Sequence, residues 1–207
     1  QLETQNEELR AEIAQLRDER SRLIGVLQEN DRLRRMVEMK TRRPEFQLVP
    51  AQVISRDVSP YFRVIKIRVR TDDAVLKPRM PVIVGEGVVG QIHEVSGKFA
   101  DVIVASDPRH RVDAISQRTR AQAVVVGLGN ERDYQARLSY LSELDSVRTG
   151  DVIVTSGMAG VFPKELIIGT VKEVRHEDRD LFQEADIEPS VDFSRLEEVF
   201  VITGAKK

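Results

Sequence analysis

Apolar residues recur along this chain with two different periods, and the period changes near residue 44. In the first part, leucine returns every seven residues, and further apolar residues fill the alternate positions of the same stripe. The stripe consists of Leu2, Leu9, Ile13, Leu16, Leu23 and Leu27. A repeat of 3.5 residues keeps such a stripe facing a partner helix. The pattern therefore predicts one coiled-coil helix over residues 1–43, which mediates dimerisation and ends before Pro44.

A single amphipathic helix packed against its own domain is the alternative interpretation of this region. The helix is heavily charged and, at about 1.5 Å per residue, would reach roughly 60 Å. A small domain cannot cover a helix of that length, so pairing with a second helix is favoured.

From residue 47 onward the apolar residues follow the two-residue period of strands. Residues 64–69 alternate apolar and charged side chains, as half-buried strands do. Turn-forming Gly, Pro, Asn and Ser residues separate the short apolar segments. We expect a first short apolar strand segment with Val49, Val53 and Ile54, and further strands near 64–69, 82–84, 88–95, 102–105, 122–126, 135–141, 152–155, 166–174 and 199–202. Many short strands at regular spacing are typical of barrels and sandwiches.

The strand region also contains an internal repeat. The triplet Val82-Ile83-Val84 recurs as Val152-Ile153-Val154, and Gly90 matches Gly169 at a larger offset, as an insertion would produce. The predicted fold is therefore mainly β, with the long coiled-coil helix in front of two small six-stranded β-barrels that arose by internal duplication. The expected barrel domains are 46–118 and 119–204, and an exchange of strands between them is compatible with the repeat.

Composition restricts the kinds of function that this chain can have. Lys plus Arg (32) nearly balances Asp plus Glu (34), so the net charge is −2 and we expect no nucleic-acid partner. The absence of cysteine excludes disulfides, thiolate zinc sites and a cysteine nucleophile. No apolar run approaches the roughly twenty residues that cross a bilayer. Because the chain begins with Gln1, we interpret it as an excised fragment, with which either a signal or a membrane anchor upstream is compatible.

Two motifs resemble cofactor or catalytic sites but lack the required context. Residues 85–90 read G-x-G-x-x-G, yet a strand pattern follows where a dinucleotide site needs a helix, so we interpret them as a hairpin turn. Ser156 suggests a serine nucleophile, but His93, His110 and His176 show neither triad nor metal-ligand context. We therefore expect no catalytic, cofactor-binding or metal site, no small-molecule substrate and no enzymatic activity.

Two further segments are candidates for contacts with other molecules. The most basic stretch of the strand region contains Arg109, Arg111, Arg118 and Arg120, and we interpret it as solvated loop and strand edge, with an anionic partner as the alternative. The second segment is an unusually apolar loop where polar turn residues would be expected. It either plugs a barrel end or forms a partner-binding or self-assembly surface. Its residues are Gly157, Met158, Gly160, Val161, Phe162 and Pro163.

The segment around this loop resembles a known family. It reads Val147-Arg-Thr-Gly-Asp-Val-Ile-Val-Thr-Ser-Gly-Met-Ala-Gly-Val-Phe-Pro-Lys-Glu-Leu-Ile-Ile-Gly-Thr-Val171. This is similar to the MreC pattern V-x-x-G-D-x-V-V-T-S-G-x-G-G-x-F-P-x-G-x-x-x-G-x-V, which follows a coiled-coil helix in that family. Residues 79–84, 87–92, 106–107 and 191–193 also resemble the family. Ala159 and Lys164-Glu165 depart from it where glycine is common.

The resemblance implies a non-enzymatic envelope scaffold of rod-shaped bacteria. Such a protein lies on the periplasmic, extracytoplasmic face and is anchored in the inner membrane. It forms homodimers or higher assemblies, binds and activates the elongation-specific transpeptidase (a penicillin-binding protein), and contacts MreD and other membrane proteins of the elongation complex. The alternative is a periplasmic adaptor of an efflux or secretion system. Adaptors insert a helical hairpin into a β domain, whereas here one helix precedes all predicted strands.

Overall fold

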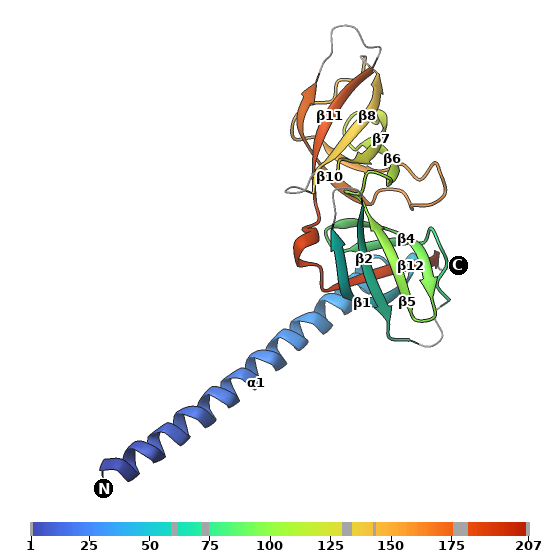
Figure 1. The fold of residues 1–207 in the computed structure, drawn as a ribbon. Coiled ribbons are helices and arrows are strands. Elements are labelled where there is room, and N and C mark those ends of the chain that lie inside the picture. Colours follow the sequence, from blue (N-terminus) through green and yellow to red (C-terminus); the bar gives the residue numbers. More distant parts are fainter. Residues whose placement is uncertain are drawn as a thin grey trace. The chain divides into compact units, whose positions relative to one another are not determined.

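A computed structural model describes residues 2–58, 62–71, 75–129, 134–142, 144–175 and 182–205. The chain divides into two compact units, Gln1–Arg43 and Pro44–Lys207. The first unit is the helix α1 (Leu2–Arg42), and the second contains the strands (Figure 1). No helix among the described residues combines the length and the apolar character that a membrane span requires.

The helix α1 is one uninterrupted element, as the heptad pattern predicted. It carries i,i+4 ion pairs such as Asp18–Arg22, at 2.8 Å, on its exposed surface. Lys40 and Arg42 lie in its last turn, where positive charge interacts favourably with the helix dipole. The N–H of Arg43 still donates to the carbonyl of Met39, and Pro44 follows immediately. The helix therefore ends directly before Pro44.

The described residues of the second unit form twelve strands and one short 3-10 helix. The strands are β1 (Phe46–Val58), β2 (Arg63–Val69), β3 (Pro81–Val84), β4 (Gly87–Ser96), β5 (Phe99–Val104), β6 (Arg111–Ser116), β7 (Gln122–Gly127), β8 (Ala136–Ser142), β9 (Val152–Thr155), β10 (Ile167–Arg175), β11 (Phe182–Pro189) and β12 (Glu198–Ala205); the 3-10 helix η1 is Phe193–Arg195. They close into two six-stranded barrels, which confirms the predicted fold class. The strands β6 and β11 were not predicted.

The two barrels have the same strand order, and each is completed by a strand from the other repeat. The first barrel runs β1-β12-β3-β4-β5-β2 and the second β10-β11-β8-β7-β6-β9. β12 lies between β1 and β3, and β6 lies between β7 and β9 in the same antiparallel manner. The repeat therefore consists of β1–β6 and β7–β12, with the sixth strands exchanged (Figure 1).

This exchange changes the division of the chain into domains. A boundary between residues 118 and 119 assigns β6 to the first barrel and β12 to the second, and the strand order places both in the opposite barrel. The physical reason is closure. An open edge between β7 and β9, or between β1 and β3, would leave unpaired N–H and C=O groups, and the exchanged strands supply their partners.

Matching details occur at equivalent points of the two repeats. Gly90 and Gly169 each lie where a Cβ would meet a carbonyl oxygen of the neighbouring strand, at 2.0 and 2.3 Å. The G-x-G-x-x-G segment forms the predicted β3–β4 hairpin, with Val84 paired to Gly87. Alternate residues of the strands fill the two cores, including Ile67 and Val201 in the first barrel and Leu138 and Ile153 in the second.

Candidate functional site

The apolar stripe of α1 is exposed along its described length. Leu2 lies in the helix, but its side chain is outside the described part. The other stripe residues expose 47–66 % of their surface: Leu9, Ile13, Leu16, Leu23 and Leu27. Contiguous exposed apolar surface is typical of protein contact sites. The stripe therefore fits the predicted pairing surface.

The loop between β9 and β10 is built by the polar residues that precede it. The Thr155 hydroxyl donates to the carbonyl of Pro163 and accepts the N–H of Leu166, at 3.0 Å. The Ser156 hydroxyl accepts the N–H of Met158 at 3.2 Å. Gly157 has a φ of 77°, and a Cβ there would meet the Lys164 side chain at 2.4 Å. The threonine, serine and glycine of the family pattern thus fix the two ends of this loop.

Phe162 differs from the other apolar residues of this loop in its burial. Its side chain is only 7 % exposed and meets the His110 ring edge-on, with the centroids 5.8 Å apart. The ring therefore belongs to the core, and it excludes water from the barrel end. Met158 is 67 % exposed, and Val161 and Pro163 are half-buried. The two readings of the loop therefore apply to different residues, since Phe162 plugs the barrel and Met158 faces outward.

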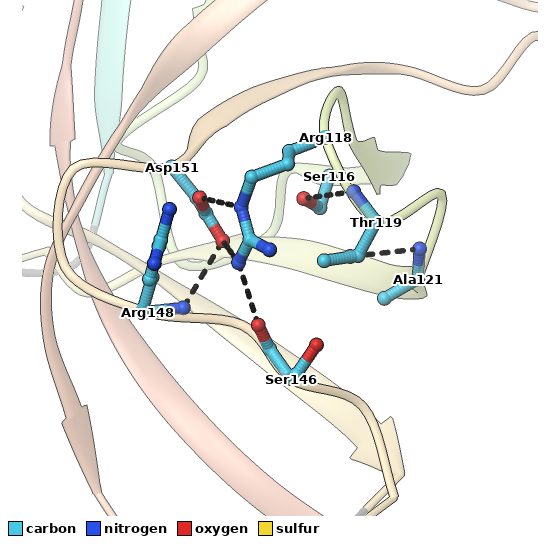
Figure 2. A network of polar contacts seen from close by, with 7 residues as sticks. All are labelled: Ser116, Arg118, Thr119, Ala121, Ser146, Arg148 and Asp151. Carbon is cyan, nitrogen blue, oxygen red and sulfur yellow. Dashed lines mark hydrogen bonds and ion pairs between the residues drawn. The ribbon is translucent and has the colours of Figure 1, made fainter.

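Asp151, which follows Gly150 in the family pattern, ties two turns together at the opposite end of the second barrel (Figure 2). Gly150 has a φ of 90°, a left-handed conformation that favours glycine. Asp151 accepts two hydrogen bonds from Arg118, both at 2.7 Å, and one from the N–H of Arg148 at 3.0 Å. Arg118 also donates to the carbonyl of Ser146 at 2.6 Å. The hydrogen bonds from Arg118 hold the pKa of Asp151 below its usual value.

Three arginines of the basic stretch are each paired with a carboxylate. Arg118 binds Asp151, and Arg120 binds Glu165 at 2.8 Å. Arg109 binds the fully buried Asp107, also at 2.8 Å. These ion pairs support the interpretation of the stretch as a structural loop and strand edge.

The turn that leads from β5 into β6 contains two buried titratable groups. Asp107 accepts the backbone N–H of Arg63 and of Arg109, at 2.6 and 2.8 Å, besides the Arg109 side chain. Burial alone raises the pKa of Asp107, but these hydrogen bonds outweigh it and the net pKa is lowered. His110 is fully buried, and desolvation lowers its pKa to about 4 against the opposing charge of Asp107. The ring is therefore neutral near pH 7.

The serine and histidines considered for catalysis do not come together among the described residues. The Ser156 hydroxyl is bonded to the N–H of Met158, as described above. Both ring nitrogens of His110 are buried without a hydrogen-bonding partner in the described part of the chain. His93 is exposed on β4, and His176 lies outside the described residues. Ser156 thus serves to shape the loop.

Comparisons with known proteins agree on one family. The family model described as "Rod shape-determining protein MreC, barrel core" matches residues 53–203. The cell shape-determining protein MreC of Escherichia coli K12 is 30 % identical over 207 residues, covering 100 % of this chain and 55 % of that protein. The MreC of Listeria monocytogenes is 28 % identical over 204 residues, covering 96 % of this chain and 68 % of the relative. The chain thus spans about half the length of the Escherichia coli relative.

Solved structures show the same architecture. One described as MreC has a TM-score of 0.76 and 25 % identity, and the match covers 86 % of this chain and 98 % of that chain. The crystal structure of MreC from Pseudomonas aeruginosa has a TM-score of 0.69 and 26 % identity, with 75 % and 99 % covered. A complex between Penicillin-Binding Protein (PBP2) and MreC from Helicobacter pylori, 12 % identical with a TM-score of 0.58, shares the fold and covers 77 % of this chain and 99 % of that chain.

A long helix followed by two closed six-stranded barrels with exchanged sixth strands defines a class of helix-bearing double-barrel proteins. The residues of the long loop pattern are structural within it, as Gly150, Asp151, Thr155 and Phe162 show. With 151 residues of the barrel-core model matched out of 207, this chain belongs to the MreC family of cell shape determinants.

The sequence carries little signal for three residues that link the two barrels: Asp107 accepts the N–H of Arg63, and the Arg63 guanidinium lies over the Tyr134 ring. Asp107 was noticed only as part of a strand end, and Arg63 and Tyr134 were not singled out. A charged residue at a strand start carries no local signal of burial, because most arginines lie at the surface. Asp107 did have one usable signal. Asp107 and Asp192 occupy equivalent places in the two repeats, because each lies in the connection that leads into an exchanged strand.

Proposed function

We propose that this chain is the extracytoplasmic part of a non-enzymatic cell-shape scaffold. In this proposal α1 mediates self-association, and the barrels bind and activate an elongation-specific penicillin-binding protein. MreD and other membrane proteins of the elongation complex are the further partners, and the anchor belongs to a part of the protein outside this chain. The adaptor alternative is not retained, because the chain belongs to the MreC family.

The exposed stripe of α1 is the observation that carries the self-association part of the proposal. The described stripe residues all expose about half of their surface or more, between 47 % and 66 %. Two such stripes pack knobs into holes when the helices pair. The charged residues around the stripe, such as Asp18 and Arg22, keep the rest of the helix solvated.

Light scattering tests this pairing directly. We expect wild-type chain to have twice its 23.5 kDa mass or a higher multiple. The double variant Leu9→Asp with Leu16→Asp places charge in the stripe and should reduce the mass to that of one chain. Ala11→Asp with Ala14→Asp is the matched control, since both residues lie outside the stripe and the added charge is the same. A wild-type mass of 23.5 kDa, or a stripe variant that keeps the wild-type mass, would contradict the proposal.

The exposed half of the β9–β10 loop is the surface that we propose for the penicillin-binding protein. Support for the class of partner comes from the Helicobacter pylori complex, in which PBP2 binds an MreC of the same fold. In this chain Met158 and the next two residues are exposed, and Phe162 supports them from inside the barrel. An exposed methionine is suited to a contact surface because its side chain adapts to the partner.

Surface plasmon resonance with the extracytoplasmic part of an elongation-specific penicillin-binding protein tests this surface. Met158→Asp should weaken binding without changing the melting temperature. Leu144→Asp is the matched control, because Leu144 is 95 % exposed and lies in the β8–β9 connection at the other end of the same barrel. If wild type, Met158→Asp and Leu144→Asp bind with equal affinity, this loop is not the binding surface. If wild type does not bind, the penicillin-binding protein is not the partner.

A further inference from the structure

The two barrels meet at a junction that the fold alone does not require. Only two connections among the described residues lead from one barrel to the other, residues 105–110 after β5 and residues 190–197 after β11. Between the barrels, the most extensive strand contact in the described part is that of β4 with β10. At this point a Cβ on Gly87 would meet the Ile167 carbonyl oxygen at 2.3 Å and the Ser190 hydroxyl at 2.4 Å. Any larger residue at position 87 would therefore push the barrels apart.

A three-membered stack crosses the same junction. Tyr134 precedes β8 of the second barrel, yet it packs against the core of the first. Its ring lies 5.2 Å from that of Phe193, which belongs to the connection between β11 and β12. The guanidinium of Arg63, the first residue of β2, lies over the Tyr134 ring, with its Cζ atom 4.7 Å from the ring centroid. A cation over an aromatic ring is attractive, and more strongly so when water is excluded.

Arg63 gains this contact at an unusual cost. It is 1 % exposed, and its Nε and Nη2 have no hydrogen-bonding partner among the described residues. The nearby carboxylate Asp107 accepts only the backbone N–H of Arg63 and gives its ion pair to Arg109. Ser106 Oγ and both nitrogens of His110, in the adjacent connection, are also buried without a partner there. Buried donors without acceptors are rare in folded proteins and destabilise the conformation that contains them.

We propose that the junction is a two-position latch between the barrels. In the closed position the Tyr134 ring contacts both Arg63 and Phe193, and the cation–aromatic contact opposes the destabilisation by buried donors that lack a partner among the described residues. In the open position the barrels separate at the contact of Gly87 with Ile167 and Ser190, and the Arg63 guanidinium reaches water. The two positions are close in free energy because the closed one combines a cation–aromatic attraction with buried donors that lack a partner in the described part of the chain. A partner that contacts both barrels can then select one position.

Distance measurements between spin labels test the latch in the chain alone. The chain contains no cysteine, so Glu94→Cys and Glu173→Cys place one label on the exposed part of β4 and one at the equivalent position of β10. We expect two distances in the wild-type background. Tyr134→Leu should increase the ratio of open to closed by about tenfold, the effect of losing a desolvated cation–aromatic contact. Tyr134→Phe keeps the ring and should leave the ratio unchanged.

A second variant acts in the opposite direction. Arg63→Met keeps the contact with the stack but removes the charge and its unpaired donors, so the closed distance should predominate. Circular dichroism checks that each variant is folded. A single wild-type distance that neither Tyr134→Leu nor Arg63→Met changes would overturn the proposal.

Gly87 provides a test that does not depend on the stack. Gly87→Ala should shift the distances toward the open position because the new methyl group meets Ile167 and Ser190. Gly85→Ala is the matched control, since a Cβ there meets nothing within 4 Å. If the stack variants do not fold, an unchanged distance distribution in Gly87→Ala overturns the latch by itself. Because partner binding is not measured, these results are independent of the function proposed above.

Discussion

The two barrels have the same strand order but differ in one connection. In the first barrel β3 and β4 are joined by the tight turn Gly85–Glu86, whereas in the second the equivalent strands β9 and β10 are joined by residues 156–166. The short turn only reverses the chain. The long loop buries Phe162 and exposes Met158. The inserted part thus adds to the second barrel one buried ring and one exposed surface that the short turn of the first barrel lacks.

A second difference concerns the two turns that lead into the exchanged strands. Asp107 and Asp192 each accept the N–H of the residue two positions later, at 2.8 and 2.9 Å. Asp107 is completely buried and paired with Arg109, whereas Asp192 is exposed. The hydrogen bonds of the buried turn therefore contribute more to the free energy of unfolding than those of the exposed turn. Burial removes the water that would otherwise replace a lost partner.

The largest difference between the two hairpin connections is expected at Phe162. Phe162→Ala should lower the free energy of unfolding by about 3–5 kcal/mol, since it leaves a cavity in the end of the second barrel. Met158→Ala, in the same loop, should change it by less than about 0.5 kcal/mol. Urea denaturation of both variants measures this contrast. Equal effects would mean that the loop does not have a buried and an exposed face.

The two aspartate turns should respond unequally to the same substitution. Asp107→Asn should destabilise the chain by about 3 kcal/mol, because it leaves the hydrogen-bond donors of Arg63 and Arg109 in a buried site without their charged acceptor. Asp192→Asn should have a smaller effect, since water reaches that turn. Thermal and urea unfolding of the two variants measure the loss in free energy of unfolding that each substitution causes. A larger loss for Asp192→Asn would show that burial does not distinguish the two turns.

The buried His110 gives the second barrel a pH dependence with a defined sign. Its pKa is about 4 in the folded chain and 6.5 in the unfolded one, so above pH 6.5 it is neutral in both. As pH falls from 6.5 toward 4, the unfolded chain takes up the proton first and stability is lost. Between pH 7.5 and 5.0 we expect a loss of about 2 kcal/mol in urea denaturation.

His110→Leu should remove this dependence in the same pH range. The carboxyl groups with lowered pKa, Asp107, Asp151 and Asp192, contribute stability that is lost only as pH falls below their usual value of 3.8. They therefore do not contribute between pH 7.5 and 5.0. An unchanged slope in the leucine variant would assign the dependence to other groups.

Most of the fold was predictable because its signals are local and periodic. The heptads gave α1 its limits, and the alternation of residues 64–69 marked β2. The strands β6 and β11 were missed because several of their buried positions hold small or polar residues, such as Ala114 and Ser116 in β6 and Gln183 and Ala185 in β11. Exchange of the sixth strands had no local signal, since it depends on which edges meet in three dimensions.

The candidate site was predictable only at the level of segments. The heptads located the stripe on α1, and its described leucines and isoleucine are exposed as a pairing surface requires. The loop after β9 was located by its apolar residues, but their composition could not decide that Phe162 points inward and Met158 outward. That depends on His110, a residue from another strand connection, against which Phe162 packs.

Amide hydrogen exchange of a chain that lacks β12 tests the exchange of strands most directly. When the chain ends at Glu197, the first barrel loses the strand between β1 and β3, whereas the second retains all six of its strands. We predict that amides in β1–β5 lose their protection and that amides in β6–β11 keep theirs. Loss of protection in β6–β11 with β1–β5 still protected would contradict the account, because β12 would then belong to the second barrel.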